Sequence, residues 1–327
     1  MAPPPPRLRL RRTLNSGVLI AVLLYALMYA IYAARASSAV TVFGLTNLLN
    51  DTVVLAVASA GLTLIVLTGE FDLSGVAVIG IANVLVATTS GGGLGWLGSL
   101  AAVLAVGAAV GALNGILVAL LNLQSLAATI GTMIACEGIA LLILPAPGGQ
   151  VADSIAYGLT GDLFGIVPVA AVLLAGLCAA WLAFTRTPLG IAIPAVGADV
   201  SAARLSGIDV RRTKLAAFII AGLCYSLAGY MLSAETGTGD PRASNTLLLF
   251  MYAAIAIGGT SLMGGHGGVF GSVVGAGILT VMQKMLFALG VAEFYTDVCN
   301  GVIMIVALLV GNLPALLARR MRSGIVP

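Results

Sequence analysis

The chain has 327 residues, of which 60% are hydrophobic and 8% are charged, and its formal net charge is +3. Soluble domains are roughly 45–50% apolar and about 25% charged, so these few charges would not coat a water-facing surface. The composition excludes an ordinary soluble protein. We expect the chain to lie in membrane lipid, with no nucleic acid among its partners.

The apolar runs predict an all-α, polytopic transmembrane helical bundle of about ten spans, because each span of a bilayer about 30 Å thick needs roughly 20 apolar residues. The expected spans are Leu14–Ala34, Thr52–Thr68, Gly75–Ser90, Trp96–Leu121, Leu126–Leu144, Ile166–Thr185, Thr213–Ala234, Thr246–Ile257, Val269–Leu289 and Phe294–Leu313. Thr246–Ile257 is shorter than a full span. We therefore expect the span to include part of the glycine-rich segment next to it, to lie obliquely, or to break inside the protein.

The basic residues predict the orientation, because cytoplasmic loops of membrane proteins keep Lys and Arg. With the N-terminus inside, twelve of the fifteen basic residues fall in cytoplasmic segments. These segments are Arg7–Arg12, Arg186–Lys214 and Arg319–Arg322. We therefore expect both termini to be cytoplasmic, with a basic, proline-rich tail at residues 1–13, a transmembrane domain at 14–313 and a second basic tail at 314–327.

The first apolar run has an alternative interpretation as a secretory signal peptide. Arg7–Arg12 precedes it, and Ala34-Arg35-Ala36 resembles a cleavage site. The run is longer than the usual apolar region of about 7–15 residues in a signal peptide. This length favours an uncleaved first span.

The first interruption of the apolar pattern is Thr68–Gly75, which carries Glu70, Asp72 and Ser74. A charge at the bilayer centre costs about 2.5–3.5 kcal/mol on insertion scales, so both carboxylates belong at an interface, at a helix cap or in a wet cavity. Transport sites tend to lie where membrane helices are interrupted. The segment is therefore either a capped turn or part of a transport pathway.

The second interruption is Gly258–Gly268, whose glycine density favours non-helical backbone and close packing. Thr260 and Ser261 can present hydroxyl groups there. The chain has no Gly-Lys-Ser or Gly-Lys-Thr, so it has no phosphate-binding P-loop of its own. His266 is the only histidine, and we interpret it as a loop residue rather than a proton relay.

Two glycine stripes with four-residue spacing favour close helix packing in lipid. They consist of Gly107, Gly111 and Gly115, and of Gly267, Gly271 and Gly275. Packing within one subunit is the plainer interpretation, and contact between subunits is the alternative. Asn83 and Asn114 lie inside small-residue spans, where each either lines a polar path or bonds a neighbouring backbone.

Arg186–Lys214 is the one extended polar segment expected on the cytoplasmic side. Within it, Asp199–Gly207 predicts a short helix with Asp199 or Ser201 as its N-cap and Gly207 just after its end. An exposed Leu205 on this helix would suit docking into a groove of a partner. An ordinary basic cytoplasmic loop is the alternative.

The residues that usually carry catalysis or bind metals are sparse. The cysteines lie in apolar stretches as small hydrophobes and predict neither a disulfide nor a metal site. They are Cys136, Cys178, Cys224 and Cys299. The sequence shows no cluster of histidines or cysteines and no nucleophile paired with a base, so we expect no catalytic residue and no enzyme.

A series of short motifs runs through most of the chain in a fixed order. They are Asn47–Asn50, Gly61–Thr63, Leu67–Gly69, Asp72–Ser74, Asn114-Gly115, Ala128–Thr132, Thr187–Gly190, Ala202–Ile208 and Gly258–Leu262. In these motifs the chain, from about Asn47 to Leu309, resembles the permease subunits of ribose-type carbohydrate ABC importers, which belong to the branched permease family of the bacterial inner membrane.

The resemblance implies an assembly rather than a protein that acts alone. Two permeases, either a homodimer or a paralogous heterodimer, would surround a pathway in the bacterial inner membrane. An extracytoplasmic, periplasmic sugar-binding protein would deliver the cargo. Cytoplasmic ABC ATPase subunits would bind ATP and Mg, so this chain itself would hold no cofactor.

Two sets of candidate residues follow. The resemblance implies that Arg186–Lys214 couples to the ATPase, and the candidates in and around its short helix are Arg186, Asp199, Arg204, Leu205, Ser206 and Asp209. The candidates for the substrate pathway come from the two interruptions and from the two asparagines inside small-residue spans. They are Glu70, Asp72, Ser74, Asn83, Asn114, Thr260 and Ser261.

The chain departs from the family pattern at three places that concern the cargo. Gly69-Glu70-Phe71 stands where relatives usually have Gly-Gly-Ile, and Glu137-Gly138 stands where they have Arg-Gly. Leu248–Phe250 replaces a usual Glu-Leu-Asp. We hypothesise either a cargo other than a common pentose, or a second, different permease that supplies the missing carboxylates.

A secondary transporter or channel that works without an ATPase is the rival class. Such a carrier would need charged relays within the membrane to couple ions to transport. The candidate relay residues are Glu70, Asp72, Glu137 and Lys284.

Overall fold

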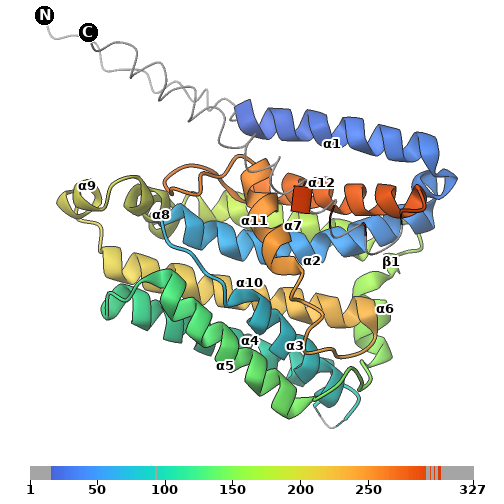
Figure 1. Cartoon of the computed structure of the whole chain (residues 1–327), viewed down its shortest axis with the longest axis horizontal. Helices are drawn as coiled ribbons and strands as arrows, with labels where there is room; N and C mark the ends of the chain where they lie inside the picture. Colours follow the sequence, from blue (N-terminus) through green and yellow to red (C-terminus); the bar gives the residue numbers. More distant parts are fainter. Residues whose placement is uncertain (1–15, 93, 292–294, 296–297, 299–300, 303–327) are drawn as a thin grey trace, which may run out of the picture.

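The computed structural model describes residues 16–92, 94–291, 295, 298 and 301–302, and this part of the chain is an almost entirely helical bundle (Figure 1). Six of its helices are long and apolar enough to cross a membrane. They are α1 (Ser16–Arg35), α2 (Val42–Leu67), α4 (Gly95–Gly115), α5 (Ser125–Ile143), α10 (Val210–Thr236) and α12 (Val269–Ala288).

Four further apolar helices complete the bundle. α7 (Val169–Phe184) and α8 (Pro188–Ala198) together pass the same test of length and composition, but they are bent by 79° at the break between them. α3 (Gly75–Thr89) and α11 (Leu247–Ile257) are apolar but short, with 15 and 11 residues. The predicted helical membrane fold is therefore present.

A helix occupies each predicted span from Leu14–Ala34 to Val269–Leu289, with one large difference in extent. α2 begins at Val42 rather than Thr52, because the Thr41 side chain caps it by accepting a hydrogen bond from the Gly44 N–H at 3.0 Å. α4 continues into a π-helical turn, η2 (Ile116–Leu120). The tenth predicted span, Phe294–Leu313, and both basic tails lie outside the described residues or largely so.

Four short elements were not expected from the sequence. The 3-10 helix η1 (Ser37–Val40) connects α1 to α2, and α6 (Asp153–Thr160) precedes the hairpin of β1 (Asp162–Leu163) and β2 (Val167–Pro168). The two strands pair antiparallel, with Asp162 opposite Pro168. These elements gather at one end of the bundle, while α8 and α9 (Val200–Leu205) lie at the other end (Figure 1).

α10 runs through the centre of the bundle and packs against α2, α3 and α4. Its crossing with α4 is a backbone contact between glycines. A Cβ added to Gly107 would lie 2.3 Å from the Gly222 carbonyl oxygen, and one added to Gly222 would lie 2.1 Å from the Gly107 carbonyl oxygen. Gly111 and Gly115 meet α10 in the same way, at Phe218 and Leu215. The first predicted stripe thus contacts a helix of the same chain.

The second predicted stripe lies at the crossing of α12 with α11. A Cβ on Gly271 would lie 2.0 Å from the Gly258 carbonyl oxygen, and one on Gly275 would lie 2.0 Å from the Ala254 carbonyl oxygen. Gly267 precedes α12 with φ +133° and packs on Thr260 instead. It belongs to the loop, so the stripe on the helix begins at Gly271.

Two spans at opposite edges of the bundle are covered least. α1 packs on α12 at one edge, and α5 packs chiefly on α3 at the other (Figure 1). Only 11% of the α1 span and 17% of the α5 span are buried, against 89% of the α2 span. Within the described residues, nothing covers the remaining faces of α1 and α5.

Candidate functional site

The break between α2 and α3 begins just after α2, at a glycine in the left-handed backbone conformation. Gly69 has φ +83°, and its N–H donates to the Val66 carbonyl at 2.9 Å. The next N–H, of Glu70, reaches back to the Ile65 carbonyl at 3.4 Å. This is the hydrogen-bond pattern of a Schellman motif, for which glycine is favoured because it adopts positive φ without strain.

A chain of buried side chains runs from this break into two other helices. Asp72 Oδ1 accepts hydrogen bonds from the Ser74 N–H at 2.8 Å and the Ser74 hydroxyl at 2.6 Å. Ser74 Oγ in turn accepts from Asn114 Nδ2 of α4 at 2.7 Å, and Asn114 Oδ1 accepts from the Thr132 hydroxyl of α5 at 2.8 Å. Three predicted pathway residues, Asp72, Ser74 and Asn114, therefore form one network.

The network corrects the expected capping of α3. Ser74 occupies the N-cap position, but its side chain accepts no hydrogen bond from the first turn of α3. Asp72 accepts from Ser74 itself, two residues on, in the manner of an Asx-turn. The carboxylate, 2% exposed, stabilises the turn rather than the helix end.

Side chains of α5 and α11 satisfy the freed backbone of the break. The N–H groups of Phe71 and Leu73 donate to Ser125 Oγ and Thr129 Oγ1, each at 3.2 Å. The Tyr252 hydroxyl accepts from the Asp72 N–H and donates to the Asp72 carbonyl, both at 3.2 Å. Non-helical backbone at membrane depth requires such partners, because lipid supplies none.

Glu70 leaves this network and pairs with a different element. Its carboxylate forms an ion pair with the Lys214 ammonium in the first turns of α10, and each side chain is 17% exposed. The pair joins the α2–α3 break to the end of the Arg186–Lys214 segment. Sequence reasoning missed this partner because 144 residues separate Glu70 from Lys214.

The second break, Gly258–Gly268 between α11 and α12, repeats the geometry of the first. Gly259 has φ +81°, its N–H donates to the Ala256 carbonyl at 3.0 Å, and the Thr260 N–H reaches the Ile255 carbonyl at 2.9 Å. Thr260 is buried and its Oγ1 accepts from the Gly268 N–H at 3.3 Å. Ser261 Oγ accepts from the Met263 N–H at 3.2 Å.

The two breaks touch each other and also touch α8. The Gly265 N–H donates to the Leu67 carbonyl at 3.1 Å. A Cβ added to Gly264 would lie 2.9 Å from Gly69 Cα, and one added to Gly197 of α8 would lie 1.9 Å from the Leu67 carbonyl oxygen. These contacts, which pattern reading did not predict, place both interruptions next to α8, the first helix of the Arg186–Lys214 segment.

Asn83 lies apart from the two breaks. It follows Ser74 by nine residues, which is about 14 Å along α3. Its Nδ2 donates to Ser233 Oγ at 3.0 Å and to the Thr238 carbonyl at 3.2 Å, and its Oδ1 accepts from the Asp240 N–H at 2.6 Å. Asn83 thus holds the connection after α10, and the predicted pathway residues do not form a single cluster.

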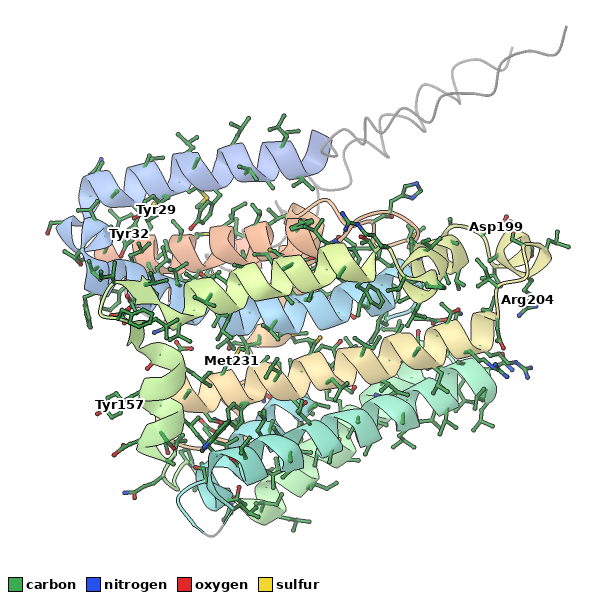
Figure 2. All side chains as sticks on the ribbon, turned by 180° about the vertical axis from the view of Figure 1, so that it is seen from behind. Tyr29, Tyr32, Tyr157, Asp199, Arg204 and Met231 are labelled. Carbon is green, nitrogen blue, oxygen red and sulfur yellow. The ribbon has the colours of Figure 1, made fainter. Side chains whose placement is uncertain are left out.

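The Arg186–Lys214 segment forms a helical elbow at one end of the bundle, and Figure 2 shows Asp199 and Arg204 there. Asp199 is the N-cap of α9, accepting from the N–H groups of Ser201 and Ala202 at 2.7 and 3.0 Å. Leu205 is 91% exposed at its end, and Gly207 follows with φ +82°. Of the two candidate caps, the residue in place is therefore Asp199.

Caps also define the two ends of the elbow. The Thr187 side chain accepts from the Gly190 N–H at 3.1 Å, and Pro188 follows it at the first position of α8. Asp209 caps α10 by accepting from the Arg212 N–H at 3.1 Å and pairs with the Arg212 guanidinium at 3.1 Å. Arg186 and Ser206 are exposed beside these turns. The predicted coupling residues thus lie in or beside the caps and turns of this segment.

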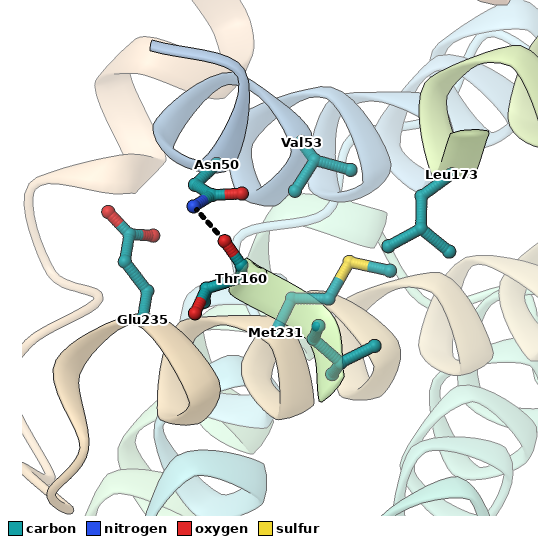
Figure 3. A pocket seen from close by; sticks show the side chains of 7 residues that line it. Asn50, Val53, Thr160, Leu173, Met231 and Glu235 are labelled. Carbon is teal, nitrogen blue, oxygen red and sulfur yellow. Dashed lines mark hydrogen bonds between the residues drawn. The ribbon is translucent and has the colours of Figure 1, made fainter. Parts of the chain in front are cut away.

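The opposite end carries a second group of charges, of which the sequence indicated only Lys284, as a possible relay. Lys284 Nζ of α12 lies 2.5 Å from Asp51 Oδ2 of α2. Close by, Asn50, Thr160 and Glu235 line a cavity of about 10 Å³, in which Asn50 Nδ2 donates to the Thr160 carbonyl at 3.0 Å (Figure 3). The cavity has about the volume that one water molecule needs.

The bundle, its broken helices and its exposed basic elbow define a multi-pass membrane transport protein. A family model for the permease component of branched-chain amino acid transport systems matches residues 44–308. The chain belongs to this family of permease components.

Curated relatives cover most of the chain. The ribose import permease of Escherichia coli (strain K12) is 33% identical over 290 residues, which is 87% of this chain and 90% of that protein. The galactofuranose transporter permease of the same organism is 33% identical over 81% of this chain and 78% of its own length. Its xylose transport system permease is 29% identical over 80% and 83%. No solved structure matches.

Proposed function

We propose that the chain is the membrane subunit of an ABC importer that forms the translocation pathway for a small carbohydrate or a related polar solute. The observation that carries this proposal is similarity over most of the chain to permeases named for ribose, galactofuranose and xylose. The chain acts with separate ATPase subunits and is itself non-catalytic. ATP and Mg belong to those partners, and this chain holds no cofactor.

The proposed assembly sits in the bacterial inner membrane. Two permease chains, which are copies or paralogues, flank the pathway, and an extracytoplasmic binding protein delivers the solute. The chain crosses the lipid about ten times with both termini in the cytoplasm. The distribution of basic residues supports this orientation, because the elbow carries Arg204, Arg211 and Arg212 at its end of the bundle.

The elbow is the proposed ATPase docking surface, and α8 connects it to the two breaks. The exposed Leu205 and Arg204 present one apolar and one charged group to a partner. Gly197 of α8 contacts the end of α2 by backbone, and the Glu70–Lys214 pair joins the same break to α10. Closure of the ATPases on ATP shifts the population between two arrangements of these breaks.

The rival, a secondary transporter without an ATPase, fits the described charges poorly. A charged relay needs groups that release and accept ions or protons within the membrane. Glu70 is held by Lys214, Lys284 by Asp51, and Asp72 by hydrogen bonds from Ser74. These partners support structural roles for Glu70, Asp72 and Lys284, whereas the fourth candidate, Glu137, has no such partner among the described residues. One curated relative is named as a probable ABC transporter permease.

Uptake by the reconstituted assembly tests the proposal. We expect proteoliposomes that contain this chain, its ATPases and its binding protein to accumulate radiolabelled ribose, xylose or another monosaccharide only with ATP. A protonophore should leave this uptake intact. Vesicles with the permease but without the ATPases are the control. Robust flux through the permease by itself would contradict the proposal.

Reversing the charge at position 204 of the docking surface should uncouple ATP hydrolysis from solute uptake. We expect Arg204→Glu to lower uptake by about tenfold or more while ATP hydrolysis continues, because a like charge at an interface costs several kcal/mol. Membrane insertion should be normal, since Arg204 is exposed on α9. Arg242→Glu, on an exposed turn before α11, is the matched control. Unchanged uptake by Arg204→Glu would remove the docking role.

A further inference from the structure

Glu137 is an anomaly among the charged residues of the bundle. It lies on α5, six residues before the helix ends at Ile143, which places it about 9 Å inside that end. Its side chain is partly exposed. Within the part of the chain that the structure describes, no ion pair or hydrogen bond reaches it.

Three other acids of the spans and breaks show the contrast. Asp51 pairs with Lys284, Glu70 pairs with Lys214, and Asp72 accepts two hydrogen bonds. A carboxylate at the depth of Glu137 that faced lipid would cost up to about 2.5–3.5 kcal/mol. Such residues therefore face a water-filled cavity or a protein partner rather than lipid.

The face of α5 around Glu137 also differs from that of α1 in carrying exposed glycines among its aliphatic residues. The outward face of α1 is built from large aliphatic side chains, among them Leu19, Leu23 and Leu27. The outward face of α5 carries large aliphatic side chains as well, among them Ile134 and Leu142, but it also includes Gly131 and Gly138, and a Cβ added to either glycine would meet nothing within 4 Å. Small residues on an open face suit close approach of another helix.

We propose that Glu137 lines the translocation pathway, across from a second copy of this chain, and accepts hydrogen bonds from the hydroxyl groups of the cargo. The proposal rests on the importer function proposed above. A carboxylate in a wet cleft between two subunits stays hydrated, and it offers strong acceptors to a neutral polyhydroxylated solute. Among the described residues, α5 packs chiefly on α3 at the edge of the bundle opposite α1, and these contacts leave its outward face available to this partner (Figure 1).

Thiol labelling in the assembled importer tests whether Glu137 faces water. Single cysteines are introduced as Glu137→Cys, and separately as Leu23→Cys on the α1 face, after the native cysteines are replaced by alanine. The probe is the cationic reagent 2-(trimethylammonium)ethyl methanethiosulfonate. We expect position 137 to react about tenfold or more faster than position 23, because the reactive thiolate forms in water and not in lipid.

A second variant keeps the test decisive if Glu137→Cys does not fold. Gly138→Cys has open space around its new side chain and lies on the same outward face. Oxidation of Gly131→Cys should also yield a cross-linked dimer of this chain, and oxidation of Leu23→Cys should not. Slow labelling at 137 and 138, equal to that at 23, would overturn the pathway role. Labelling without a dimer would overturn the second copy.

The transport assay separates this proposal from the function on which it rests. For whichever monosaccharide the wild-type importer accumulates, we expect Glu137→Gln to raise KM about tenfold and to change the maximal rate little, because an amide oxygen is a weaker acceptor than a carboxylate. Glu137→Asp should recover part of the loss. An unchanged KM would overturn the cargo contact while leaving the importer function standing.

Discussion

Replacing Asp72 with alanine is expected to destabilise the protein severely and to abolish uptake. The change leaves the N–H and hydroxyl of Ser74 without their buried acceptor. Each buried polar group left unsatisfied costs about 1–3 kcal/mol. The series of hydrogen bonds from Thr132 through Asn114 to Ser74 then no longer ends on a carboxylate.

Thermal unfolding of the detergent-solubilised protein, followed by size-exclusion chromatography, measures this effect. Asp72→Asn keeps an acceptor oxygen and should retain most of the stability. Asp240→Ala is a matched control, because Asp240 accepts from the Arg242 N–H in a similar two-residue turn that is exposed. Its cost should stay within about 0.5 kcal/mol. Equal melting of Asp72→Ala and the wild type would contradict the role of the network.

A single methyl group at Gly107 is expected to be nearly as damaging. In Gly107→Ala, the new Cβ would lie 2.3 Å from the Gly222 carbonyl oxygen and 2.4 Å from Ser226 Oγ. Contacts this short force α4 and α10 apart, and overpacking of this kind costs about 1–3 kcal/mol. The damage is central, because α10 packs against three spans.

The control for Gly107 is Gly176 on α7, where an added Cβ meets nothing within 4 Å. Gly176→Ala should be neutral or should stabilise by up to about 1 kcal/mol, because alanine is the better helix former. The same chromatographic melting assay compares the two variants. The α4–α10 backbone contact would be refuted if both variants melted at the same temperature.

The positions of the long helices were predictable because lipid imposes a simple rule on length and polarity. The start of α2 was not, because Asn47, Asn50 and Asp51 interrupt the apolar run and indicate a loop. In the fold they are satisfied by distant groups, since Asn50 bonds Thr160 and Asp51 pairs with Lys284. Hydropathy along the chain does not contain such partners.

The candidate site was predictable in its parts and not in its assembly. Interrupted helices and a capped elbow are local features, and the sequence predicts them at Thr68–Gly75, Gly258–Gly268 and Asp199–Gly207. Their contact at Gly197 depends on which helices cross, and no local pattern encodes that. The separation of Asn83 from the other candidates was not predictable for the same reason, since Thr238 and Asp240, which it bonds, follow α10.

The meeting of Gly69, Gly197 and Gly264 has a mechanical consequence. Three main-chain segments contact one another there, with no side chain between them. At ordinary helix contacts, side chains change rotamer and so accommodate small shifts. A direct contact between main-chain atoms has no side chain that could do this. A displacement of α8 should therefore be passed undiminished to both interrupted helices, so that they respond together rather than one after the other.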